Sequence, residues 1–427
     1  MKKISRPVPR FGRQAWAWCF YDWADSVFAT TVMAGFFPIF FKNFWSVGVE
    51  ATTSSARLGV ISSLASLGIG LLGPFLGAAA DRRGRIKPYL ALLAVPGMIA
   101  TALLALVPQG EWLTAAFCYL IGLAGFTGGS ALYDALLPKV APTHRLDAVS
   151  SAGYALGYLA GGLMLALNVA MVLKPETFGL AGPEQAVAWS FVLVAIWWAV
   201  FSLPLFFLVR ETSTPGGSTI PTLSRLIRTL KSLPADRPLF LFLLAYWLYI
   251  DGVHTLMRMA VDFGLSIGFS PQDLISALLL VQFVGLPASL LFGYIGSKVG
   301  TMTGILLALT IYLGISVWGV FIDTRLEFYL LAAAIGLAQG GIQALSRSWF
   351  AAIIRPEQAG ELFGLFNLVG RFSTVLGPVL MGGTAVLLHA SGLEGELASR
   401  LSLLVLALFF VGGGVLAVAA QRARQTS

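Results

Sequence analysis

Long apolar segments alternate with short polar or charged segments along nearly the whole chain. About 20 mainly apolar residues suffice to cross the hydrocarbon core of a bilayer as an α-helix. The pattern predicts an all-α integral membrane protein with twelve such helices. The connections between the apolar runs are short, so we expect no soluble domain between them. The predicted helices cover residues 15–41, 58–80, 88–108, 112–137, 148–173, 187–209, 239–263, 274–296, 301–322, 327–353, 362–388 and 399–420.

Two carboxylates interrupt the first apolar segment. Asp22 and Asp25 are three residues apart, so a helix places both on one face, with Ser26 one turn beyond Asp22. An ionised Asp at membrane depth costs roughly 2.5 to 3.5 kcal/mol on insertion scales, so such residues usually have a partner or a function. We expect a proton, cation or substrate site that faces a water-filled cavity. The alternative is a structural pair that holds neighbouring helices.

Composition and charge narrow the class of protein. With 57% hydrophobic and 11% charged residues, the chain differs from soluble domains, in which about 25% of residues are charged. Basic residues gather in alternate connections, on the side of the N-terminus, so the positive-inside rule predicts that both termini are cytoplasmic. The net charge of +8 then indicates contact with anionic membrane lipids and not with nucleic acid.

The chain also repeats itself. Three pairs of stretches keep their order: Asp22 to Ser26 with Asp251 to Thr255, Gly77 to Gly84 with Gly293 to Gly300, and Gly128-Gly129 with Gly340-Gly341. This repeat predicts two six-helix halves, residues 1–209 and 239–427, in parallel repeat. Residues 210–238 form the linker, which begins with a polar run and continues as a short amphipathic helix. This organisation resembles that of the major facilitator fold, in which substrate binds near the midplane between the halves.

The stretch from Gly77 to Lys87 resembles the signature loop between the second and third helices of the major facilitator superfamily. By that resemblance Asp81 latches the two halves in the outward-facing state. Gly84 permits the tight turn after the helix. The gating residues implied are Asp81, Arg82, Gly84 and Arg85. The alternative is a solvated run of charges.

A narrower resemblance extends over essentially the whole chain. Residues 21–31, 249–253, 339–348 and 363–367 are similar to the vacuole-effluxer-like branch of that superfamily, and the run from Gln339 to Ser348 is the most specific part. Fungal members of the branch are similar to amino-acid exporters that recycle products of vacuolar breakdown, whereas most bacterial members are recognised only as permeases. The resemblance implies a bacterial-type permease of the inner membrane.

Polar residues on the tenth and eleventh predicted helices point to a binding site. Gln339, Gln343 and Arg347 are spaced by four, so they form one polar stripe, and Asn367 adds a polar group on the next helix. A buried arginine needs an acid or an anionic ligand. For Arg347 the candidates are the aspartates across the cavity or a substrate carboxylate; the alternative is a static ion pair. The expected substrate-binding residues are Tyr21, Asp22, Asp25, Asp251, Gln339, Gln343, Arg347 and Asn367.

Four titratable residues are candidates for proton coupling. They are Asp22, Asp25, Asp251 and His254. Two carboxylates one turn apart in a low-dielectric cavity do not both ionise freely, so one of the first pair is expected to carry a proton. His254 lies one turn from Asp251 and can gate a proton near neutral pH, or it is a satisfied polar core residue.

The sequence therefore predicts a secondary active transporter, and not an enzyme. It moves a small polar solute, an amino acid or similar zwitterion, by alternating access with proton or cation coupling. A non-transporting sensor or scaffold, or a lipid translocase, are the alternatives. We expect no cofactor and no metal, since Cys19 and Cys118 both fall in predicted helices, and we expect a monomer.

Overall fold

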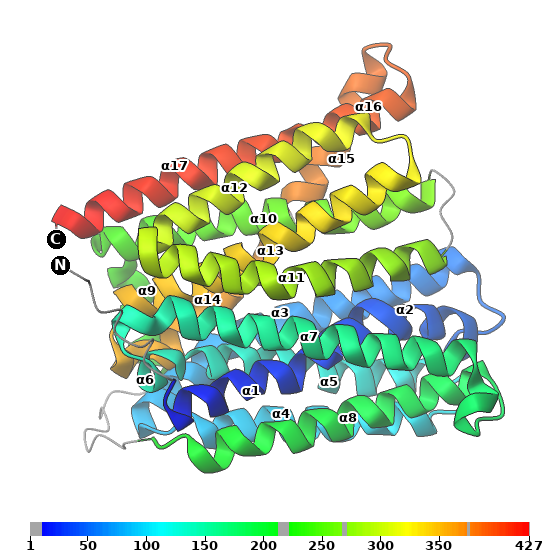
Figure 1. Ribbon diagram of the computed structural model, residues 1–427, viewed down its shortest axis with the longest axis horizontal. Coiled ribbons are helices and arrows are strands. Elements are labelled where there is room, and N and C mark those ends of the chain that lie inside the picture. Colours follow the sequence, from blue (N-terminus) through cyan, green and yellow to red (C-terminus); the bar gives the residue numbers. More distant parts are fainter. Residues whose placement is uncertain (1–10, 212–221, 267–270, 374–375, 427) are drawn as a thin grey trace, which may run out of the picture.

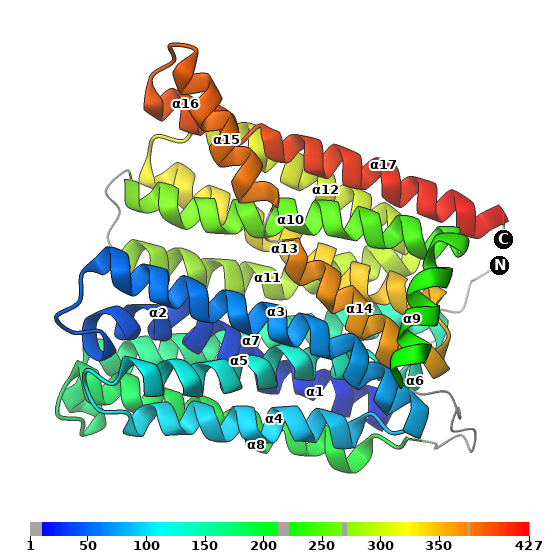
Figure 2. The ribbon, with the colours of Figure 1, turned by 180° about the vertical axis from the view of Figure 1, so that it is seen from behind.

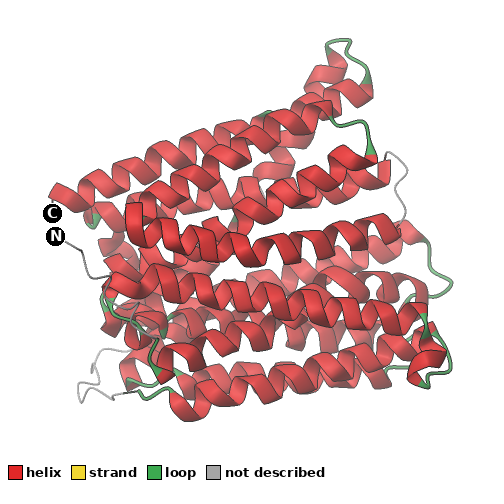
Figure 3. Cartoon of the chain, viewed as in Figure 1, coloured by secondary structure: helices red, strands yellow, loops and turns green. Residues whose placement is uncertain are grey.

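The computed structural model describes residues 11–211, 222–266, 271–373 and 376–426. Every regular element within these ranges is a helix, as Figure 3 shows. The expected all-α class is therefore confirmed for the described part of the chain. The polar beginning of the expected linker, residues 212–221, and the basic residues among positions 1–10 lie outside the described residues.

The long helices run side by side along one axis (Figures 1 and 2). They are α1 (Arg13–Val27), α3 (Ala51–Arg83), α4 (Lys87–Leu103), α5 (Trp112–Asp134), α7 (Leu146–Leu173), α8 (Pro183–Leu208), α10 (Arg237–Ser266), α11 (Pro271–Val299), α12 (Thr301–Trp318), α13 (Arg325–Ile353), α14 (Ala359–Phe372), α15 (Leu376–Ala390) and α17 (Val405–Thr426). Both ends of the described chain lie at the same end of the bundle, which we call the terminal end.

Shorter helices join or extend the long ones. The α-helices are α2 (Phe37–Phe40), α6 (Leu137–Val140), α9 (Thr222–Ser232) and α16 (Gly395–Ser402). The 3-10 helices are η3 (Leu104–Leu106), η4 (Thr143–Arg145), η5 (Pro175–Phe178), η6 (Leu233–Ala235), η7 (Gly319–Phe321) and η8 (Pro356–Gln358). Two π-helices, η1 (Phe28–Phe36) and η2 (Phe41–Trp45), continue α1.

Eleven stretches of the described residues are long and apolar enough to cross a membrane. The expected second segment, residues 58–80, lies inside α3, a single helix of 33 residues that is not among these eleven. The expected count of twelve therefore stays a prediction. The eleventh expected segment is helical on both sides of residues 374–375, with α14 ending at Phe372 and α15 beginning at Leu376.

The first membrane segment changes its winding directly after its two carboxylates. α1 ends at Val27 and the π-helix η1 begins at Phe28. A π-helix bonds residue i to i+5, so its turns are wider than those of an α-helix, and such turns are often found at functional sites. The hydroxyl of Thr30 donates to the backbone oxygen of Ser26 (3.2 Å), which supplies a side-chain partner where the α-helical pattern ends.

The main contacts between the helices before the linker and those after it are those of α3 with α14 and of α7 with α11 and α13. The α3–α14 contact depends on glycine. A Cβ atom on Gly77 would lie 2.0 Å from the backbone oxygen of Gly360, and one on Gly364 would lie 2.6 Å from Cα of Pro74. The backbones are therefore close enough that only glycine fits, which is the packing role expected for glycines in membrane helices. The division into two repeated halves stays a prediction.

Candidate functional site

Arg347 on α13 is the centre of a buried polar cluster. Its side chain donates from Nη2 to Asp22 Oδ2 (2.9 Å) and from Nη1 to Asp134 Oδ1 (3.0 Å). A longer contact joins Nη1 to Asp22 Oδ1 (3.4 Å). Ser150 on α7 accepts the remaining donors, from Nε to Oγ (2.9 Å) and from Nη2 to the backbone oxygen (2.9 Å). All five N–H groups of the guanidinium therefore have an acceptor.

Aromatic rings close this cluster from the side. The guanidinium carbon of Arg347 lies 4.2 Å from the ring centre of Tyr154 and 4.6 Å from that of Trp18. Gly153 makes room for the ion pair, because a Cβ atom there would lie 2.3 Å from Asp22 Oδ2. With Arg347 only 2% exposed, the ion pairs are held in a dry environment, where their mutual attraction is stronger than in water.

Asp134 is the carboxylate of this cluster that the sequence analysis did not name, and Ser150 was not named either. It is the last residue of α5 and only 7% exposed, and its Oδ2 also accepts from Nδ2 of Asn367 on α14 (3.4 Å). The signal was present, because Asp134 lies within the expected fourth segment, residues 112–137, and an aspartate at membrane depth calls for an explanation. The cluster thus joins α1, α5, α7, α13 and α14.

Asp25 lies beside this cluster and differs from its neighbours. It is 3% exposed and feels the charges of Asp22, Asp134 and Arg347, yet within the described ranges its carboxylate makes no hydrogen bond or ion pair with another residue and bonds only its own backbone N–H. The hydroxyl of buried Tyr21, four residues earlier on the helix, also lacks a partner among the described residues. Three buried carboxyl groups therefore lie near one guanidinium, which bonds only Asp22 and Asp134.

The structure places Asp251 and His254 in a second polar region, on α10. The Asp251 carboxylate accepts from the backbone N–H groups of Gly377 (3.0 Å) and Leu376 (3.1 Å), so it caps the N-terminus of α15. Thr255 donates to the same carboxylate (3.1 Å). Buried Nδ1 of His254 has no partner in the described part of the chain. No hydrogen bond or ion pair between described residues joins this region to the Arg347 cluster.

The polar stripe on α13 is only partly engaged. Arg347 is bound as described, Gln343 is half-buried, and Oε1 of buried Gln339 has no partner among the described residues. The structure thus brings together Asp22, Arg347 and Asn367 of the expected site, with Asp25 and Tyr21 adjacent. The expectation that all the named residues line one cavity stays a prediction.

The expected latch has a definite geometry at the terminal end. Asp81 at the end of α3 accepts from the backbone N–H groups of Gly360 (3.0 Å) and Glu361 (2.8 Å), the first turn of α14. A carboxylate is favourable there because the N–H groups of a helix start are otherwise unpaired and carry partial positive charge. Arg225 on α9 completes the contact, with Nε 2.9 Å from Glu361 Oε2 and Nη2 3.8 Å from Asp81 Oδ2.

The other expected gating residues surround this contact. Gly84 has φ of 64°, in the left-handed region, so it turns the chain after α3 as expected. Arg82 and Arg85 are exposed. The latch joins the first and the second set of helices through backbone hydrogen bonds, and its gating role stays a prediction.

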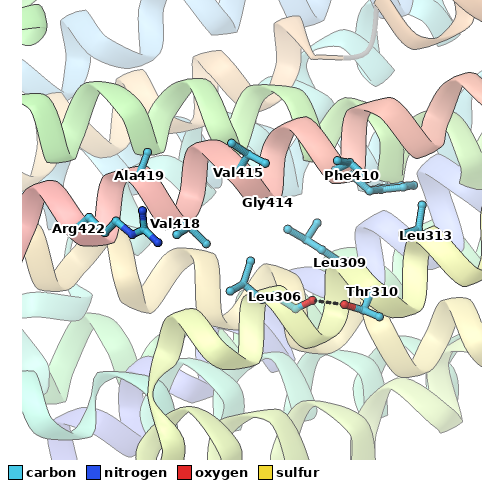
Figure 4. A pocket seen from close by; sticks show the side chains of 11 residues that line it. Leu306, Leu309, Thr310, Leu313, Phe410, Gly414, Val415, Val418, Ala419 and Arg422 are labelled. Atoms are coloured by element: carbon cyan, nitrogen blue, oxygen red, sulfur yellow. Dashed lines mark hydrogen bonds between the residues drawn. The ribbon is translucent and has the colours of Figure 1, made fainter.

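A groove between α12 and α17 lies apart from these polar residues (Figure 4). It has a volume of about 550 Å³ and is lined mostly by apolar side chains, with Arg422 near the end of α17. None of the expected site residues lines it. Its exposed apolar walls, such as those of Val411 and Val415, suit contact with lipid chains and not a polar solute.

Comparison with known proteins agrees with this architecture. The family model described as vacuole effluxer Atg22 like matches residues 12–425. The chain belongs to this family. A relative, the MFS-type transporter YxiO of Bacillus subtilis, is 34% identical over 386 residues, covering 89% of this chain and 90% of that protein. The Autophagy-related protein 22 of Yarrowia lipolytica is 25% identical over 268 residues, covering 55% of this chain and 45% of that protein.

Solved structures show the same fold for the Atg22-like chain. The human organic anion transporter MFSD10 aligns with a TM-score of 0.71 and 16% identity over 95% of this chain and 99% of that chain. The proton:xylose symporter XylE aligns with a TM-score of 0.69 and 13% identity, over 94% and 93%. The protein is therefore a membrane transporter of the major facilitator superfamily, and not an enzyme.

Proposed function

We propose that this Atg22-like transporter is a secondary active permease that moves an amino acid or similar zwitterion, with a proton or cation gradient as the driving force. The observation that carries the proposal is the excess of acid in the Arg347 cluster. Asp22, Asp25 and Asp134 are all less than 10% exposed, yet among the described residues Arg347 is the one cation that pairs with any of them. If all three were ionised, the cluster would carry two uncompensated negative charges at membrane depth, which is costly.

A cation or proton removes this excess. Asp25 is the natural acceptor, because its carboxylate pairs with no other described residue and lies near two other acids. The ammonium group of a zwitterion would serve the same purpose, because it brings positive charge and three hydrogen-bond donors. The carboxylate of that zwitterion can take the place of Asp22 or Asp134 beside Arg347. The planar guanidinium can donate to both oxygens of one carboxylate at the same time. Binding of solute and proton would then be linked.

Two seams between the helix sets support alternating access. The α3–α14 and α7–α11 contacts join residues 1–209 to residues 239–427, which we propose move as two halves about the Arg347 cluster. We further propose that the terminal end faces the cytoplasm, that the membrane is the bacterial inner membrane, and that the functional unit is a monomer. Exposed basic residues near the terminal end, among them Arg82, Arg85 and Arg228, support this orientation.

Counterflow in proteoliposomes tests the proposal. Vesicles loaded with unlabelled amino acids, one at a time, are mixed with the same labelled amino acid, and a pH gradient is then imposed. We expect saturable counterflow for at least one amino acid and pH-driven accumulation of the same solute. A matched control is Glu184→Gln, which removes an exposed carboxylate in the first turn of α8, outside the cluster. Absence of counterflow across the panel, in a chain that is folded, would exclude amino acids as the substrate.

The latch yields a separate prediction. Asp81→Asn removes the charge that binds the first turn of α14 and is expected to change the transport rate several-fold while changing the apparent substrate affinity little. The reason is that Asp81 biases the populations of two states, typically separated by a few kcal/mol, and does not touch the Arg347 cluster. Initial rates of counterflow at several solute concentrations separate the two quantities. An unchanged rate with weakened substrate binding would contradict the gating role.

A further inference from the structure

The short helix α9 lies across the terminal end of the bundle, roughly perpendicular to the long helices (Figure 2). Because the long helices cross the membrane, a helix in this orientation lies parallel to the membrane plane. Helices of this kind rest at the membrane interface when they combine an apolar stripe with a basic face. α9 has both features, and a further side of the helix contacts the bundle.

The apolar stripe of α9 is left uncovered by the protein. Leu223, Ile227 and Leu230 are 59%, 45% and 45% exposed, and their spacing of four and three places them on one side of the helix. Arg228 and Lys231, both exposed, project from another side of the same helix. Apolar side chains beside basic ones match the boundary between acyl chains and anionic headgroups, where each basic residue strengthens binding.

The third side of α9 carries Arg225, which contacts the latch between Asp81 and the first turn of α14. Arg225 is 9% exposed and donates from Nε to Glu361 Oε2 (2.9 Å) and from Nη2 to the backbone oxygen of Glu357 (3.2 Å). The same guanidinium lies 3.8 Å from Asp81 Oδ2. One helix of eleven residues therefore presents lipid-compatible side chains on one face and, on another, the cation that joins α3 to α14.

We propose that α9 docks on the anionic surface of the membrane and that this docking holds the latch closed. An anchored α9 keeps Arg225 between Glu361 and Asp81, whereas an α9 released from the lipid loses this fixed position. Lipid charge would thereby set the balance between the latched and unlatched states of the transporter. The inference rests on the proposed alternating access, but its test needs no transported solute.

The test measures a distance across the latch. Spin labels at His144→Cys, in the 3-10 helix before α7, and Arg355→Cys, just before η8, report whether the two sides separate; both positions are exposed. The native Cys19 and Cys118 are buried and are labelled in the parent chain to measure the background. Distances are recorded in nanodiscs of phosphatidylcholine alone and of phosphatidylcholine mixed with phosphatidylglycerol. We expect the ratio of short to long distances to rise roughly tenfold in the anionic lipid.

Two variants of α9 identify the source of this response. The triple variant Leu223→Ser, Ile227→Ser, Leu230→Ser and the double variant Arg228→Gln, Lys231→Gln are both expected to lose most of it. Leu397→Ser with Leu404→Ser, at exposed positions in and beside α16, is the matched control and should respond as the parent does. Identical distance distributions in the two lipids would overturn the proposal, as would a full response in the triple variant. A parent chain that transports nothing but still shows the lipid response would disprove the proposed function alone.

Discussion

Replacing Arg347 by alanine is expected to abolish transport and to lower the free energy of unfolding by about 3 to 5 kcal/mol, the usual cost of removing one partner from a buried ion pair. The side chain is 2% exposed and bonds two carboxylates and Ser150, so its loss leaves Asp22 and Asp134 as buried acids without their cation. Denaturant unfolding in detergent measures the stability, and counterflow in proteoliposomes measures the transport.

Two further variants show whether charge is the cause. Arg210→Ala removes an exposed arginine and should leave both stability and transport close to those of the parent. Arg347→Gln combined with Asp22→Asn and Asp134→Asn removes the ion pairs as a set, and it should recover most of the lost stability while remaining inactive. If Arg347→Ala has the same free energy of unfolding as the parent, the ion pairs do not hold the helices together.

The second prediction concerns coupling, and Asp25 is its subject. Asp25→Asn is expected to abolish pH-driven accumulation while exchange of solute across the membrane continues. With one proton per solute, a gradient of one pH unit supports about tenfold accumulation, so the variant should fall from that ratio to about one. The amide keeps the shape of the side chain but cannot carry a proton, and the carboxylate that it replaces bonds no other residue in the described part of the chain. Labelled solute inside the vesicles is measured with and without the gradient.

Asp22→Asn provides the comparison. It also should abolish pH-driven accumulation, but it weakens the bond to Arg347, so it is expected to slow exchange as well. The two variants therefore separate a group that carries a proton from a group that holds the arginine. Full pH-driven accumulation in both would show that the pair is structural, and the coupling site would then be sought at Asp251 and His254.

Much of the Arg347 cluster could be predicted from the sequence, because a charge in an apolar segment demands an explanation. Asp22 was a named candidate partner of Arg347, and the structure confirms the contact between them. Asp134 met the same criterion but lay near the end of its segment, where a charge is easily attributed to the membrane surface. Asp251 was another candidate partner of Arg347, and the structure shows its carboxylate capping α15, a contact that depends on where that helix begins.

The sequence by itself determined the all-helical class, most of the membrane segments and the latch loop. These follow from local physics: in hydrocarbon the backbone must satisfy its own hydrogen bonds, so apolar segments of sufficient length become helices. Only the tertiary structure decided which charges meet. Asp22 and Arg347 are 325 positions apart, and Arg225 reaches Glu361 across 136. No local period carries such information, because these contacts depend on how the helices are arranged, and that arrangement is set by packing over the whole bundle.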